Sequence, residues 1–96
     1  MTRLTKDYHA SLIEALRDPE EAAAYLTAAL AERDMPTFLL ALRNVAEAKG
    51  MSALAAKAQL NRESLYRMLS AQGNPQLSSV QALLQALDLA LTVTAK

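Results

Sequence analysis

The stretch SALAAKAQLNRESLYRMLS, residues 52–70, decides the fold that we expect for this chain. It predicts two short helices joined by a tight turn, the first over residues 53–58 and the second over residues 62–70. Ser52 and Asn61 are expected to cap them, because a side-chain oxygen at a helix start accepts from a backbone N–H that otherwise has no partner. The second helix would bury three apolar residues that recur at i, i+3 and i+4: Leu65, Met68 and Leu69.

The outward face of this second helix carries polar groups suited to reading DNA. In helix-turn-helix proteins the start of the second helix enters the major groove, where side chains meet base edges and phosphates. The expected DNA-binding residues are Ser52, Lys57, Asn61, Arg62, Glu63, Ser64, Tyr66 and Arg67. We expect Arg62 to reach a base edge, whereas Lys57 and Arg67, further from the groove floor, would contact phosphate.

A structural interpretation of the same residues stays open. An ordinary αα-hairpin in a helical bundle has the same periodicity, and its outward polar residues merely face water. Gln59, in the turn with Leu60, stands where DNA-binding turns commonly have glycine. A left-handed backbone there costs a residue with a Cβ on the order of 1 kcal/mol. The residues alone therefore allow both a DNA-binding motif and a plain hairpin.

Length and composition are typical of one small helical domain over residues 1–96. Hydrophobic residues make up 52% of the chain, which has only two glycines. The absence of cysteine excludes disulfides and thiolate metal sites and fits a reducing cytoplasm. No apolar run approaches the roughly 20 residues of a membrane span, and residues 1–18 are too charged for a signal peptide. We expect a soluble cytoplasmic protein.

Charge is distributed unevenly along the chain, although the formal net charge is zero. Residues 1–34 hold four basic and seven acidic side chains, a net charge of −3. Residues 49–74 hold four basic and one acidic side chain, a net charge of +3. An acidic front and a basic helix pair indicate two surfaces that bind different partners.

The rest of the chain predicts further helices and one short strand. The helices are expected over residues 8–17, 19–33, 36–49 and 77–87. Asp18 and Pro19 mark a helix start, and Gly50 marks the end of what we expect to be the central core helix. The tail changes to period two, which predicts a β-strand over residues 89–94. The fold class is therefore all-α, with about five to six helices and a short C-terminal strand.

The predicted strand indicates a homodimer. Leu89, Leu91 and Val93 would share one of its faces, and an isolated strand leaves backbone N–H and C=O groups unpaired. The expected partner is the same strand of a second copy across a two-fold axis. Pairing with residues 3–5 of the same chain is the alternative.

Catalysis finds little support in the sequence. His9 is the only histidine, and no second ligand or nucleophile accompanies it, so a surface or capping role is expected. Glu20 and Glu21 are adjacent, so their side chains diverge and do not form a paired acid and base. They are better interpreted as first-turn partners of a helix dipole. We expect no enzymatic activity, no cofactor and no metal site.

Four segments together resemble a known family: DPEEAAAYL (18–26), FLLALRNVAEAKG (38–50), LNRESLYRMLS (60–70) and GNP (73–75). They are similar to the small antidote proteins of bacterial addiction modules. Those antitoxins have a lambda-repressor-like (Xre-type) helix-turn-helix and are commonly encoded beside a toxin of the RelE or HigB type. The resemblance covers about residues 8–93, and Gln59 departs from the usual turn glycine. It implies a lambda-repressor-like bundle that blocks a cognate toxin and represses its own operon by binding double-stranded operator DNA.

The acidic N-terminal region is the expected toxin-binding surface. RelE-type toxins are basic, according to the same resemblance, and opposite potentials steer association. The expected residues are Tyr8, Leu12, Glu20, Glu21 and Tyr25, although helical spacing also explains the three apolar ones as core. A stand-alone Xre-type repressor without a toxin partner is the main alternative function. A structural interaction module comes next.

Overall fold

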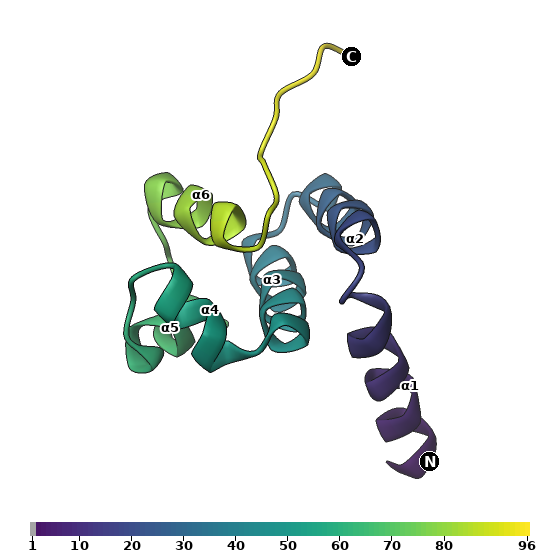
Figure 1. Ribbon diagram of the computed structural model, residues 1–96. Helices are drawn as coiled ribbons and strands as arrows, with labels where there is room; N and C mark the ends of the chain where they lie inside the picture. The colour runs from purple at the N-terminus through teal and green to yellow at the C-terminus, as the bar shows by residue number, and fades with distance from the viewer. Residues whose placement is uncertain (1) are drawn as a thin grey trace.

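The computed structural model describes residues 2–96, and their side chains from residue 6 onward. The described chain forms six helices: α1 (Thr2–Ala15), α2 (Pro19–Ala31), α3 (Met35–Lys49), α4 (Met51–Lys57), α5 (Arg62–Met68) and α6 (Leu77–Ala86). Figure 1 shows α3 between α1 and α2 on one side and α4, α5 and α6 on the other. The all-α prediction is confirmed, and each predicted helix matches one of the six. None of the described helices is both long enough and apolar enough to span a membrane.

α3 forms the centre of the core and contacts α1, α2 and α4. Its buried residues surround much of the helix: Phe38, Leu39, Ala41, Leu42, Val45 and Ala46. Leu39 and Leu42 have no exposed surface, so replacing either with alanine is expected to cost about 2–5 kcal/mol of stability. The prediction of a central core helix over this segment is confirmed.

α2 begins where the sequence predicted. The Asp18 carboxylate accepts from the Glu20 N–H at 3.1 Å, and Pro19 is the first helical residue, where no N–H is needed. Glu20 and Glu21 lie in the first turn, near the positive end of the helix dipole. The buried face of α2, which packs on α3, consists of Ala22, Leu26 and Ala29.

α1 starts and ends earlier than predicted, spanning Thr2–Ala15 rather than residues 8–17. Figure 1 shows it projecting away from the other helices. Of its described side chains, Leu12 and Ile13 are partly buried, and Leu16, just after the helix, is buried. Among the described side chains, burial therefore begins at Leu12, and hydrophobic spacing revealed the part of α1 around it.

The predicted C-terminal strand is wrong. No strand occurs within residues 2–96, and the chain after α6 has no regular secondary structure. A strand needs a neighbour that takes its N–H and C=O groups, and residues 3–5, the alternative partner, belong to α1. Leu89 packs against the core, whereas Leu91 is 37% and Val93 98% exposed. Figure 1 shows this tail extending away from the helices. The alternating pattern reflects docking of its first residues, not backbone pairing.

The connection between α5 and α6 depends on Gly73. A Cβ at this position would collide with the backbone carbonyl oxygen of Met68. The Gly73 N–H also donates to the Ser70 carbonyl at 2.9 Å. Because backbone rather than a flexible side chain occupies the space, only glycine lets the chain turn so closely after α5.

Candidate nucleic-acid interface

The turn between α4 and α5 has the local chemistry that the sequence predicted. Gln59 takes a left-handed backbone with φ of 60°, although it is not glycine. Asn61 caps α5, and its side-chain oxygen accepts from the Ser64 N–H at 2.6 Å. Leu65 and Leu69 are buried at 0% and 2% exposure. The cap and these two anchors fix which face of α5 points outward.

The predicted cap of the preceding helix is wrong. α4 begins at Met51, so Ser52 lies inside its first turn and is exposed. The capping position belongs to Gly50, which makes no side-chain hydrogen bond and ends α3 as well. One residue with φ of 102° therefore joins two helices, a conformation that glycine adopts without strain.

The exposed side chains of α5 are organised in two pairs. The Arg62 guanidinium lies over the Tyr66 ring, 5.8 Å from its centroid. Arg67 forms an ion pair with Glu63 at 3.3 Å, with side chains 72% and 86% exposed. Exposed pairs of this kind stabilise a helix by only about 0.3–0.5 kcal/mol, so a competing partner displaces them readily.

α5 lies between two surface hollows. One, of about 260 Å³, is lined from α3, α4 and α5 by Arg43, Glu47, Met51, Ser52, Arg62 and Tyr66. The other, of about 460 Å³, has polar lining residues from α5, the following turn and the start of α6: Ser64, Arg67, Ser70, Gln72, Asn74 and Ser79. The structure thus brings five of the predicted residues onto the two sides of one helix.

Arg43 shares the first hollow with Arg62 and was missed by the sequence prediction. It is exposed on α3, beside the buried residues Leu42 and Val45. The sequence signal was weak, because Arg43 is one of two cations in α3, with Lys49, and its position relative to α5 depends on tertiary packing. Glu47 is the acidic residue of this hollow, and its Oε2 lies 2.9 Å from Nε2 of His9 in α1. His9 therefore has a surface role, as predicted.

Lys57 is the predicted DNA-binding residue that the structure separates from the others. Its ammonium pairs with the Asp88 carboxylate at 3.5 Å, after the end of α6. It lines neither hollow beside α5. Any phosphate contact by Lys57 has to compete with this ion pair.

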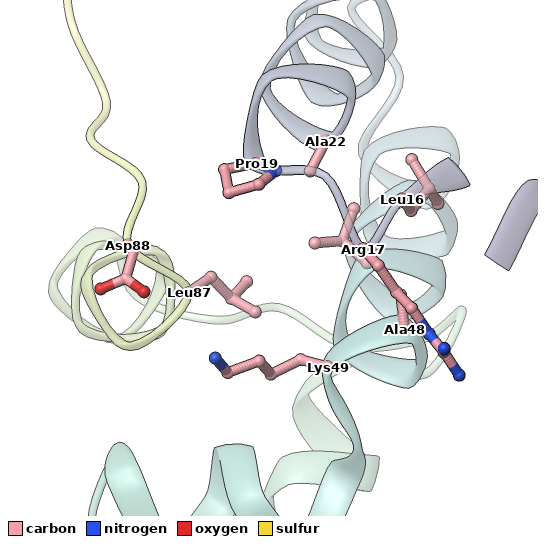
Figure 2. A pocket seen from close by; sticks show the side chains of 9 residues that line it. Leu16, Arg17, Pro19, Ala22, Ala48, Lys49, Leu87 and Asp88 are labelled. Atoms are coloured by element: carbon pink, nitrogen blue, oxygen red, sulfur yellow. The ribbon is translucent and has the colours of Figure 1, made fainter. Parts of the chain in front are cut away.

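A third hollow, of about 200 Å³, lies at the junction of the α1–α2 turn, the end of α3 and the end of α6. Figure 2 shows Lys49 pointing toward Leu87 and Asp88, whereas the Arg17 guanidinium points away from them. Apart from Arg17, Lys49 and Asp88, the residues that line this hollow are apolar. None of the predicted site residues is among them.

The predicted toxin-binding residues divide into exposed and packed ones. Tyr8 is 74% exposed, and Glu20 and Glu21 are exposed at the start of α2. Leu12 is partly buried against the core. Tyr25 is also partly buried, and its hydroxyl accepts from the Asn44 amide of α3 at 2.9 Å. Leu12 and Tyr25 therefore have structural roles that explain them without a partner.

Comparisons with known proteins connect the chain to one family. A family model described as "probable addiction module antidote protein" matches residues 6–95. A protein of Haemophilus influenzae (strain Rd), described as uncharacterized, is 38% identical over 93 residues, covering 97% of this chain and 94% of that protein. No solved structure matches. On the family match and on this identity, the chain belongs to the probable addiction module antidote protein family.

Proposed function

We propose that this chain is the antidote of a toxin–antidote pair that neutralises a RelE-type toxin and represses its own operon. Family membership supports the existence of a cognate toxin. The RelE type rests on the sequence resemblance described above. Repression requires a DNA-binding surface, and the exposed polar face of α5 is the observation that carries this part of the proposal.

The dimensions of α5 suit the major groove. With its side chains an α-helix such as α5 is about 10–12 Å across, and the major groove is about 12 Å wide. Hollows on both sides of α5 leave the helix as a ridge. A lambda-repressor-like helix-turn-helix formed by α4 and α5 would insert this ridge, with the capped N-terminus of α5 nearest the bases.

The cations around α5 have separable roles in this proposal. Arg62, at the start of the helix, reads a base edge, with Ser64 and Asn61 beside it. Arg67 exchanges its exposed Glu63 partner for phosphate, and Arg43 contributes a second phosphate contact from α3. Lys57 contacts phosphate at the edge of the interface.

The toxin surface lies on α1 and the start of α2. Among the N-terminal residues, Tyr8 offers exposed apolar surface, and Glu20 and Glu21 offer exposed negative charge to a basic partner. Figure 1 shows α1 and α5 on opposite sides of α3, so one antidote has room for toxin and operator together.

Two measurements test the proposal separately. Co-expression with the neighbouring toxin gene should restore growth and give a complex that co-purifies. Mobility-shift titrations should show tighter binding to the duplex upstream of the operon than to a scrambled duplex. DNA binding without a toxin complex would favour the stand-alone repressor, and a toxin complex without DNA binding would leave α4 and α5 as a structural hairpin.

A further inference from the structure

Glu47 lies where the N-terminal helix meets the surface beside α5. Its Oε2 is 2.9 Å from Nε2 of His9, a contact that joins α3 to α1. The same side chain lines the hollow beside α5 together with Arg43 and Arg62. Among the described ion pairs, Glu47 pairs with His9 and with neither of these arginines. One carboxylate therefore connects α1 with the proposed DNA surface.

Arg43 is an alternative partner for Glu47 within α3. The two residues are four apart in this helix, so their side chains lie on one face and are close enough to pair. The contact with His9 is open to solvent, because both its side chains are 53% exposed. Exposed contacts of this kind are weak and exchange readily. His9 and Arg43 thus compete for one carboxylate, and His9 holds it in the structure.

The partner that Glu47 takes determines what Arg43 offers to DNA. A carboxylate paired with Arg43 would offset the positive charge that attracts a phosphate. It would also place a negative charge beside the DNA backbone, which it repels. While the carboxylate is held by His9, the Arg43 guanidinium stays available to phosphate.

We propose that His9 is a positioning residue for the DNA surface, which keeps Arg43 available to phosphate by holding Glu47. His9 acts through Glu47 and does not touch DNA, since it belongs to α1, on the other side of α3 from α5 (Figure 1). The inference rests on the DNA binding proposed above and does not depend on the toxin. Because phosphate contacts carry no sequence information, the effect is the same on operator and scrambled duplexes.

Three single variants are expected to differ in DNA affinity, measured by fluorescence anisotropy at low salt. Glu47→Gln removes the competing charge and should bind both duplexes about two- to fivefold more tightly than the wild type. His9→Ala releases Glu47 to Arg43 and should bind about twofold more weakly, the factor that corresponds to an exposed i, i+4 pair. His9→Glu repels Glu47 toward Arg43 and should bind about fivefold more weakly, the factor for two unit charges about 4 Å apart in water.

Ala10→Glu is the matched control for His9→Glu. It adds the same charge to α1 one residue later, at an exposed position about 100° further around the helix. DNA affinity should stay near that of the wild type. The differences caused by Glu47 and His9 should shrink as salt rises from about 50 mM to about 1 M, because salt screens exposed charges. A difference caused by damaged packing would persist at high salt.

Double variants test whether His9 acts through Glu47 and Arg43. His9→Ala is expected to cause no further loss of affinity in a Glu47→Gln chain or in an Arg43→Gln chain. A loss that persists in either background would overturn the inference, because His9 would then act by another contact. Wild-type affinity in both His9→Ala and His9→Glu would overturn it too, while DNA binding by α5 would stand. A wild-type chain that binds neither duplex would overturn the proposed repression and this inference together.

Discussion

The Arg62 guanidinium carbon lies 5.8 Å from the centroid of the Tyr66 ring, one helical turn further along α5. Arg62 Nη2 also donates to the Tyr66 hydroxyl at 3.4 Å. Both side chains are exposed, so this cation–π contact is worth only about 0.5–1 kcal/mol. Its main consequence is geometric, because the ring restricts the directions in which the guanidinium points.

Arg62→Ala is expected to relax sequence discrimination by about 1–3 kcal/mol, the contribution of a bidentate arginine to guanine. Tyr66→Ala keeps the Arg62 guanidinium but removes the ring that restricts its direction, so a smaller loss of sequence discrimination is expected. Tyr66→Phe keeps the ring and serves as the control, with discrimination near that of the wild type. Mobility-shift titrations against operator and scrambled duplexes of equal length measure the ratio of the two affinities. Equal ratios for wild type and Arg62→Ala would rule out the base contact.

Lys57 and Asp88 allow a test of phosphate contact. Lys57→Ala is expected to weaken binding to operator and scrambled duplexes alike, and to reduce the slope of log affinity against log salt by about one unit. Asp88→Asn removes the competing carboxylate, and asparagine tolerates the left-handed φ of 62° at this position. That variant is expected to bind both duplexes more tightly.

The double variant Lys57→Ala/Asp88→Asn distinguishes two explanations for tighter DNA binding by Asp88→Asn: release of Lys57 from its ion pair, and the less negative net charge of the chain. If Asp88 acts by holding Lys57, Asp88→Asn has no effect in the Lys57→Ala background. An unchanged salt slope in Lys57→Ala would show that this lysine makes no phosphate contact.

Gln59 is a position where the native residue limits stability. Gln59→Gly removes the steric strain of φ 60° and is expected to raise the free energy of unfolding, by at most about 1 kcal/mol. Ala56→Gly, at an exposed position inside α4, is the control and should lower it by about 0.5–1 kcal/mol. Denaturant unfolding measures both. A less stable Gln59→Gly protein would mean that the entropy of glycine in the unfolded chain outweighs the strain.

Features set by local chemistry were predictable from the sequence. The caps at Asp18 and Asn61 and the left-handed turn at Gln59 each depend on a few neighbouring residues, and all three occur in the structure. Ser52 failed as a cap because α4 begins two residues earlier than predicted, with Gly50 in the capping position.

Features set by tertiary contact were not predictable. Apolar residues alternate from Leu89 to Val93. This pattern is the same whether the segment pairs with another strand or packs on a helix, so it does not distinguish the two. The place of Arg43 beside Arg62 depends on how α4 packs against both α3 and α5, which periodicity within one helix does not reveal.

The acidic start of α2 should act mainly on the rate of toxin binding. Changing both Glu20 and Glu21 to glutamine is expected to slow association and to make it less sensitive to salt, with little change in dissociation. The same change weakens the dipole interaction at the α2 N-terminus, by about 0.3–1 kcal/mol per charge. Surface plasmon resonance at two salt concentrations measures the rates. An unchanged association rate would show that Glu20 and Glu21 lie outside the toxin-binding surface.

Point substitutions are the proper test of the N-terminal toxin site, because truncation damages the core. A chain beginning at Asp34 would lack α2, whose Ala22, Leu26 and Ala29 are buried against α3. Loss of toxin binding by such a chain would then report unfolding as readily as a lost interface.

Tyr8→Ala avoids this difficulty because the side chain is 74% exposed. Stability should change by less than about 0.5 kcal/mol. If Tyr8 is an aromatic anchor of the complex, toxin affinity should fall by about 2 kcal/mol, roughly thirtyfold, while operator binding stays unchanged. Tyr25→Phe is the structural control: loss of the hydrogen bond to Asn44 should lower stability by about 0.5–1.5 kcal/mol without weakening toxin binding. Calorimetric titration of the purified toxin with each variant measures these affinities. Wild-type affinity in Tyr8→Ala would show that the toxin docks elsewhere on the antidote.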